Sequence, residues 1–246
     1  MISKEKVIIV GGGLSGLTLA YLLQKKGIGT TLLEASSRLG GRIQTVKGKM
    51  GTPLELGATW FADKHQSFSS LVDELLLQKF PQYSKGITLF QTKSFEPPQK
   101  FFVPEAEDPS YRIVGGTQML IYTLTKKLDA KHIRLGAKVT AVNAIKDGVT
   151  IEISDGTTLH ADKVVICIPP PLAVSEIEFF PALPADVQTV LSTVQTWMAG
   201  AIKFALEYAG PFWRTLPAGI HAQCACWPSS CQDTRMWERF QRWATA

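Results

Sequence analysis

The sequence predicts an α/β fold built on a doubly wound, mostly parallel sheet. A short apolar run at 7–10 leads into a glycine-rich stretch at 11–16 and then into an apolar helical run, the order typical of a first βαβ unit. Farther along, three strand-like runs joined by Asp-Gly pairs predict an antiparallel β-meander. With 45% hydrophobic and 19% charged residues, the 246-residue chain has the composition of a globular protein.

The glycine-rich stretch is the first candidate site. Gly11, Gly13 and Gly16 satisfy the G-x-G-x-x-G spacing. A tight turn, a close backbone approach to a pyrophosphate and close packing of helix on strand each exclude a side chain, and free amides at the start of a helix attract phosphate. The helix is expected over 14–26, with Gly27 suited to its C-terminal cap. The candidate phosphate-binding residues are Gly11, Gly13, Leu14, Ser15 and Gly16.

The second predicted strand, at 30–33, ends in an acidic residue, Glu34. This carboxylate follows the glycines by about 20 residues, where it can accept hydrogen bonds from ribose hydroxyls. It would also repel a 2′-phosphate, which disfavours NADP. The glycine pattern alone fits any strand-to-helix turn, but strand, glycines, helix, strand and acid in this order favour a dinucleotide site.

The next stretch, EASSRLGGR at 34–42, resembles the E-A-x-x-R-x-G-G-R signature of the flavin amine oxidase family. The resemblance implies FAD lying along the first βαβ unit, with Ala35, Gly41 and Arg42 in the cofactor-binding set and Arg42 approaching the phosphates. Physically, Arg42 offers a bidentate fork to a pyrophosphate, and two adjacent glycines let the main chain pass close to a ligand. A surface ion pair would also account for Arg42.

Two shorter stretches carry the resemblance further. ELGATW at 55–60 looks like the family's loop beneath the flavin ring, which implies cofactor contacts from Gly57, Ala58, Thr59 and Trp60. A generic glycine turn ending in a core tryptophan explains the same letters. GAKVTAV, at the start of the meander, is similar to the family segment that contacts the adenine, which implies a role for Val139, although a strand valine is more often core.

Other elements follow from periodicity. An amphipathic helix is predicted from the stripe Phe68, Leu71, Val72, Leu75 and Leu76, and a second helix, with Thr117 as its N-cap, from Ile121, Leu124 and Leu128. Strands are predicted at 86–91 and 99–103, and the meander strands at 137–145, 149–153 and 157–160. The apolar run at 163–168, ended by three prolines, predicts a parallel strand buried on both faces.

Residues 199–208 alternate as a strand does, and Lys203 interrupts the face made of small residues. Such a lysine either discourages edge-to-edge pairing or is an amine kept for a purpose. The sequence at 199–208 resembles the amine-oxidase segment whose lysine holds a water against flavin N5, which implies a catalytic Lys203. It further implies FAD-dependent oxidation of an amine C–N bond to an imine, with dioxygen as oxidant and hydrogen peroxide as product.

The chain also departs from the family. The large helical part of the substrate domain expected between 79 and 115 is missing, and the resemblance ends near 214. We therefore expect an FAD-binding domain from 1–78 and 113–170, an incomplete α+β substrate domain from 79–112 and 171–214, and an atypical tail at 215–246. Our hypothesis is a truncated or frameshifted product with weak or absent flavin binding and impaired activity.

Two other functions stay open. One is a related FAD oxidoreductase of the carotenoid desaturase or protoporphyrinogen oxidase type, although the presence of Lys203 disfavours it. The other is a noncatalytic nucleotide-binding fragment, which truncation would favour.

Composition narrows the remaining possibilities. The excess of five positive charges is scattered rather than clustered, so nucleic acid is not an expected partner. Apolar runs are too short for a membrane span or a signal peptide, which predicts a cytoplasmic location. The four cysteines and four histidines show no common metal-binding spacing, so no metal is predicted. The expected partners are a small amine and dioxygen; the oligomeric state does not follow from the sequence.

Overall fold

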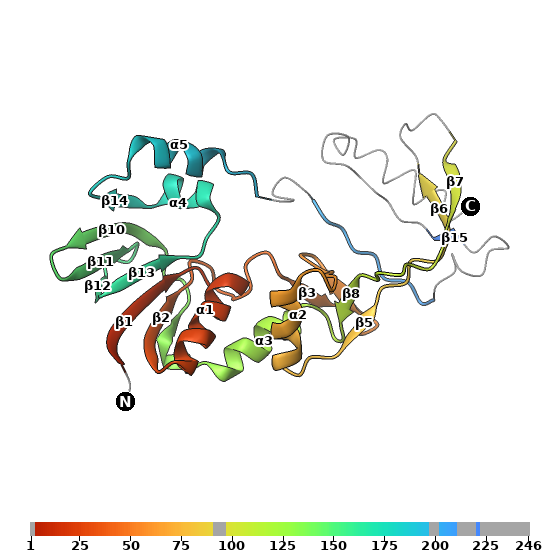
Figure 1. The fold of residues 1–246 in the computed structure, drawn as a ribbon, viewed down its shortest axis with the longest axis horizontal. Coiled ribbons are helices and arrows are strands. Elements are labelled where there is room, and N and C mark those ends of the chain that lie inside the picture. The colour runs from red at the N-terminus through yellow and green to blue at the C-terminus, as the bar shows by residue number, and fades with distance from the viewer. Residues whose placement is uncertain (1–2, 91–96, 197–201, 211–219, 222–246) are drawn as a thin grey trace.

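The computed structural model describes residues 3–90, 97–196, 202–210 and 220–221. Figure 1 shows an elongated molecule in which two sheets lie at one end and the β6–β7 hairpin at the other, with helices α1, α2 and α3 between them. The helices are α1 (Leu14–Lys25), α2 (Gln66–Glu74), α3 (Gln118–Lys127), α4 (Pro170–Glu176) and α5 (Ala185–Thr193), and one 3₁₀ turn, η1, spans Ala130–His132.

The strands form five small sheets. Three are small sheets of two or three strands: β3 (Thr45–Lys47) with β4 (Pro53–Glu55), β5 (Lys79–Pro81) with β8 (Tyr111–Ile113), and β6 (Gly86–Phe90) with β7 (Gln99–Val103) and β15 (Ile220–His221). The other two are the central sheet, made of β1 (Ser3–Val10), β2 (Ile28–Leu33), β9 (Ile133–Arg134) and β13 (Lys163–Ile166), and the meander sheet, made of β10 (Val139–Ile145), β11 (Gly148–Ile153), β12 (Thr158–Ala161) and β14 (Glu178–Phe180).

The central sheet is parallel throughout and has the order β13-β1-β2-β9. Successive residues of β1 point to opposite faces. Val7 and Ile9 pack on one side with residues of α1, α2 and α3, while Ile8 and Val10 pack on the other with the meander. Both faces of β1 are covered, which explains why its sequence is apolar without alternation. The predicted α/β fold with a parallel sheet is confirmed.

The meander is confirmed as well. Its strands lie in the order β12-β11-β10-β14, and the pairs β12–β11 and β11–β10 are antiparallel. Gly148 and Gly156 have φ of 133° and 86°, a conformation that explains the glycine in each Asp-Gly pair. Strand β14, which periodicity did not predict, joins parallel to β10.

Two helix predictions were right in place and wrong in detail. Helix α2 buries Leu71, Val72 and Leu75 but ends at Glu74, so Leu76 does not continue its stripe; Leu76 is 89% exposed and has a φ of 55°. Helix α3 starts after Thr117, but the Thr117 side chain makes no capping hydrogen bond. The Gln118 amide instead donates to Thr45 Oγ1, at 3.0 Å.

Gly27 has a φ of 72° and its amide donates to the Gln24 carbonyl, so the predicted helix end at this glycine is confirmed. The predicted burial of strand β13 was wrong. It is the last strand of the central sheet as described, and Val165 is 36% exposed, so only one of its faces is packed.

The predicted strand at 199–208 was also wrong over the part that the structure describes, residues 202–208. This segment is extended, yet no strand among the described residues pairs with it. It is instead held by side chains, as shown below.

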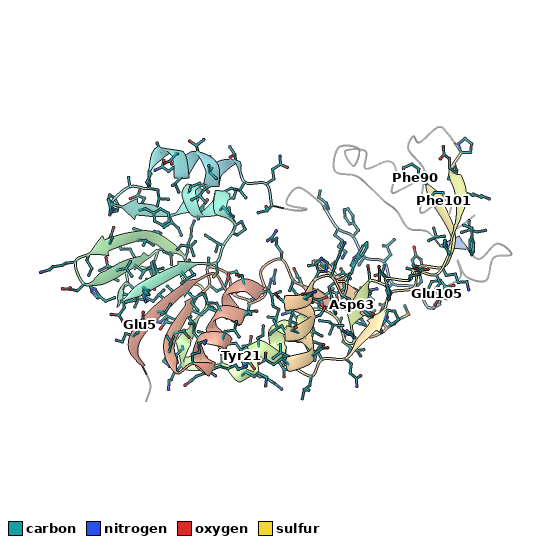
Figure 2. The ribbon with its side chains drawn as sticks, in the orientation of Figure 1. Glu5, Tyr21, Asp63, Phe90, Phe101 and Glu105 are labelled. Carbon is teal, nitrogen blue, oxygen red and sulfur yellow. The ribbon has the colours of Figure 1, made fainter. Side chains whose placement is uncertain are left out.

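The two strands predicted at 86–91 and 99–103 are confirmed over their described residues. They pair as an antiparallel hairpin, β6–β7, that extends away from the body (Figure 1). Figure 2 shows Phe90 and Phe101 on it, far from Tyr21 in the helical core. Phe90 and Phe101 are 37% and 47% exposed, whereas Tyr21 is 8% exposed. Of the 215–246 tail, only β15 at 220–221 lies within the described residues, and it runs parallel to β6.

Candidate active site

The glycine-rich loop joins β1 to α1, and two of its glycines are required by the protein itself. Gly11 has a φ of 109°, and a Cβ there would lie 2.7 Å from Ile168 Cγ2. A Cβ on Gly16 would lie 2.0 Å from the Gly11 carbonyl oxygen. Neither position can hold a side chain without a shift of main chain, so the turn and the close approach of helix to strand depend on them.

Gly13 is different. A Cβ built on it would meet nothing within 4 Å, and its φ of −76° suits any residue. It occupies the N-cap of α1, where no side chain caps the helix and no acidic residue lies in the first turn. The first amides of α1 are thus offered toward open space, with half-buried Leu14 and exposed Ser15 beside them. This arrangement suits an anionic ligand at the helix N-terminus.

Glu34 follows β2 and reaches back to the glycine-rich loop. Its Oε2 accepts a hydrogen bond from the Gly12 amide at 2.7 Å, and its Oε1 accepts from the Ser36 amide at 2.8 Å and the Ser36 hydroxyl at 2.7 Å. The carboxylate therefore stands beside the loop, as the sequence predicts. Because each carboxylate oxygen has two acceptor positions, Glu34 retains capacity for a further donor such as a ribose hydroxyl.

The two-glycine element lies directly on the first loop. The Gly40 amide donates to the Gly12 carbonyl at 2.8 Å, and a Cβ on Gly41 would come within 3.4 Å of Gly13 Cα. Arg38, which had no assigned role, fixes this turn: its guanidinium donates to the carbonyls of Gly41 at 2.7 Å and Ile43 at 3.1 Å. The two glycine motifs, distant in sequence, thus form one cradle.

Arg42 connects the cradle to the 57–60 loop. Its carbonyl accepts from the Ala58 amide at 3.1 Å, and a Cβ on Gly57 would lie 2.1 Å from that same carbonyl oxygen. The Arg42 side chain is exposed, as are Ala58 and Trp60. At 58% exposure, Trp60 is not the core tryptophan of a generic turn.

Lys203 reaches the same loop from a distant part of the chain. Its Nζ donates to the Gly57 carbonyl at 2.9 Å and to Thr59 Oγ1 at 2.5 Å. Four residues on, Glu207 accepts hydrogen bonds from the amides of Met50 at 3.0 Å and Thr52 at 3.1 Å. The predicted alternation holds to this extent: Lys203 and Glu207 face the body, while Ile202 and Phe204 are 82% and 60% exposed.

The electrostatic surroundings of Lys203 differ from those of a surface lysine. Partial burial lowers the pKa of its amine below the ordinary value; the Glu55 carboxylate opposes this change, and the Arg112 guanidinium adds to it. In its protonated form, the amine donates to these two acceptors and keeps a third hydrogen for a water or a substrate.

Sequence reasoning missed Glu55. It lies inside the ELGATW stretch, but the family resemblance implied roles only for the four residues from Gly57 onward. Glu55 is 6% exposed and is, with Thr117, one of two polar residues fully enclosed among the described residues. A glutamate two residues before Gly57, at the end of the short strand β4, was the signal that could have found it.

Val139 begins β10, and its side chain is 4% exposed in the core between the central sheet and the meander. The chain just before it lies against the Glu34 loop, because the amides of Gly136 and Ala137 donate to the carbonyls of Ser36 and Glu34. Its main chain is thus near the expected sugar, while an adenine contact stays a prediction. Ala35, in the same loop, is exposed.

Comparison with known proteins identifies the family. The profile of the family described as flavin containing amine oxidoreductase matches residues 14–101 and 90–241, which is well over half of the chain. A probable flavin-containing monoamine oxidase A of Dictyostelium discoideum is 24% identical over 305 aligned positions, covering 85% of this chain and 66% of the relative. That alignment is longer than the chain, so the relative has internal residues without a counterpart here.

Two further similarities have different reach. Coproporphyrinogen III oxidase of Bacillus subtilis is 41% identical, but over 81 residues that cover 30% of this chain and 17% of the relative. The solved structure of cyclohexylamine oxidase from Brevibacterium oxydans superposes with a TM-score of 0.67 at 17% identity, covering 76% of this chain and 63% of that one. This last likeness establishes the fold. The chain spans slightly less than two thirds of these amine-oxidase relatives.

Within the described residues, no helix is long and apolar enough to cross a membrane.

Proposed function

Because this chain belongs to the flavin containing amine oxidoreductase family, we propose that it binds FAD and that the whole protein oxidises an amine C–N bond to an imine. Dioxygen would reoxidise the flavin and yield hydrogen peroxide. When bound, the flavin supplies the two-electron chemistry, and the protein supplies binding, orientation and electrostatics.

The observation that carries the proposal is the contrast among three glycines. Gly11 and Gly16 are explained by contacts within the protein, but Gly13 faces open space at the uncapped start of α1. A pyrophosphate whose oxygens approach the first amides of α1 explains why this position lacks a side chain. Gly41 lets the neighbouring turn lie close to Gly13. From that turn, the Arg42 guanidinium would contact the negatively charged pyrophosphate.

The remaining cofactor-binding residues follow the same line. Glu34 would accept from the ribose, the main chain at Val139 would lie by the adenine, and residues 57–60 would lie beneath the flavin ring. Lys203 would stand at the reacting end, where its amine, fixed by Gly57 and Thr59, can hold a water or orient the substrate.

A second candidate is an FAD oxidoreductase of the protoporphyrinogen oxidase type. The similarity to coproporphyrinogen III oxidase favours it, but that similarity covers 30% of the chain. Such a function has no need for an amine fixed over the 57–59 turn, so Lys203 supports the amine oxidase.

The proposal is tested by mixing the FAD-loaded protein anaerobically with a panel of primary and secondary amines and with porphyrinogens. Bleaching of the flavin absorbance by an amine, strongly slowed in a Lys203→Met variant, supports the proposal. Bleaching by porphyrinogens alone, with no effect of Lys203→Met, would replace it with the second candidate.

A further inference from the structure

Glu55 ends strand β4, and its carboxylate is enclosed by three donors. Its Oε1 accepts from the Thr117 amide at 2.6 Å and the Thr117 hydroxyl at 3.1 Å, and its Oε2 accepts from the Thr45 hydroxyl at 2.9 Å. A carboxylate that is 6% exposed is costly unless its acceptor positions are filled, and here three of about four are.

The first consequence of these bonds is local. Thr117 precedes α3, so the Glu55 charge faces the N-terminus of that helix, where the helix dipole favours an anion. Thr45 Oγ1, which donates to Glu55, also accepts from the Gln118 amide. Glu55 thus joins the β3–β4 hairpin to α3, two elements that are 62 residues apart at Glu55 and Thr117.

The second consequence reaches Lys203. The Thr117 hydroxyl lies 3.4 Å from the Thr59 carbonyl oxygen, and Thr59 Oγ1 accepts from Lys203 Nζ. Because the hydroxyl shares its single hydrogen between Glu55 and Thr59, the turn that holds the lysine is in contact with the threonine that Glu55 binds. The charged groups that act on the Lys203 amine are Glu55, which favours its protonated form, and Arg112 on β8, which disfavours it.

We propose that Glu55 is a positioning residue for Lys203: it anchors the 57–59 turn through Thr117 and supplies the negative charge that the Lys203 amine faces. The inference rests on the proposed function only in taking Lys203 as the residue at the reacting end. Glu55 would touch neither cofactor nor substrate and would act through Thr117, Thr59 and its charge.

A purely structural role for Glu55 predicts a different outcome. If Glu55 only held the fold, its loss would open the site to water, and the pKa of Lys203 would rise toward the ordinary lysine value because burial is what lowers it. If Glu55 supplies charge to a site that stays closed, its loss removes the opposing influence and the pKa of Lys203 falls further. The two roles thus shift the Lys203 titration in opposite directions.

The experiment is a pH titration of Lys203 reactivity in the full chain, without flavin. Brief acetic anhydride labelling at a series of pH values, quantified at Lys203 by peptide mass spectrometry, reports the deprotonated amine. We expect the midpoint in Glu55→Gln to lie at lower pH than in wild type, and the labelling rate near neutrality to rise at least about threefold.

Two matched variants frame the result. Glu74→Gln removes a carboxylate that pairs with Lys25 and is not among the charges that act on Lys203, so its Lys203 midpoint should equal that of wild type. Arg112→Gln removes the neighbouring cation, and its midpoint should move to higher pH. If Glu55→Gln does not fold, Glu55→Asp carries the test, with a smaller downward shift because the charge is kept but withdrawn.

An unchanged or raised midpoint in Glu55→Gln, or in Glu55→Asp where that variant is used, would overturn the inference. Because no flavin is present, this result says nothing against FAD binding. Conversely, a failure of the chain to bind FAD would remove the proposed function but leave the Glu55 titration standing.

Discussion

The glycine cradle and the Lys203 segment (residues 202–210) are two halves of one candidate site, and they are built differently. The cradle is assembled from main-chain contacts between neighbouring elements, as in the Gly40 amide on the Gly12 carbonyl. The Lys203 segment is held by two charged side chains, Lys203 and Glu207, across sequence separations of 144 to 157 residues. Substitutions that displace the main chain should therefore do most damage in the glycine cradle. In the Lys203 segment, only substitutions of Lys203 and Glu207 should have a large effect.

Two alanine substitutions in the cradle should give the largest effect and test whether its stability depends on main-chain contacts. Gly16→Ala would set a Cβ 2.0 Å from the Gly11 carbonyl oxygen. Overpacking of this kind costs about 3 kcal/mol, and the better helix propensity of alanine returns about 1 kcal/mol. We expect the free energy of unfolding to fall by about 2 kcal/mol, measured by urea denaturation. Gly13→Ala, with open space around the new Cβ, should cost less than about 1 kcal/mol. Equal losses in the two variants would show that Gly13 also has a packing role.

In the Lys203 segment we expect the reverse: a substitution should change stability little and the proposed reaction strongly. Lys203→Met removes a partly buried amine with two hydrogen bonds, so stability should change by only about 1 kcal/mol. Its proposed role predicts a loss of about a hundredfold in the anaerobic rate of flavin reduction by amine. Stopped-flow absorbance measures this rate. A rate within twofold of wild type would remove Lys203 from the mechanism.

Glu207 tests whether the segment is clipped in place by charge. Replacing it with Gln keeps the shape but loses the charge that accepts from the Met50 and Thr52 amides. We expect hydrogen exchange at these two amides to become several-fold faster by NMR, with the cradle amides of Gly12 and Gly40 unchanged as an internal control. Faster exchange at all four amides would mean that the two halves are not independent.

Lowering the pH should have the smallest effect of these changes, and it should weaken the same hydrogen bonds from the Met50 and Thr52 amides to Glu207. The Met50 amide, together with Thr52, lowers the pKa of Glu207 below its ordinary value of 4.5. A depressed carboxyl pKa contributes stability that is present above 4.5 and lost as the pH falls below it. The protection of the Met50 amide, taken as its exchange rate relative to the intrinsic rate at the same pH, should therefore fall below pH 4.5 in wild type. Glu207→Gln should lack this step. A step in the variant would point to another carboxylate.

The comparison also explains what the sequence could predict. The contacts of Gly11, Gly16 and Glu34 could be predicted from spacing because they lie between elements adjacent in the βαβ order, whereas Gly41 came from the family resemblance. The meander followed from strand-like runs joined by Asp-Gly turn residues in the same way. These features are encoded locally, in spacing and residue type.

Features set by distant contacts were predicted poorly. Lys203 came from family resemblance, and the strand expected around it was wrong because the alternation reflected docking by side chains rather than pairing with a neighbour. Thr117 was expected to cap α3 itself, but Thr45, 73 residues away from Gln118, takes that role. Glu55 gave no periodic signal at all, since its burial depends on Thr45 and Thr117 coming together.

The central claim is that the open space at Gly13 is where a two-phosphate ligand lies. Calorimetric titration of FAD into wild type and Gly13→Ala tests it most directly, because the substitution should leave the fold intact. The account predicts weak but saturable binding of one FAD per chain in wild type, and binding at least about tenfold weaker still in Gly13→Ala. Equal affinities in the two proteins, or no binding by wild type, would contradict it.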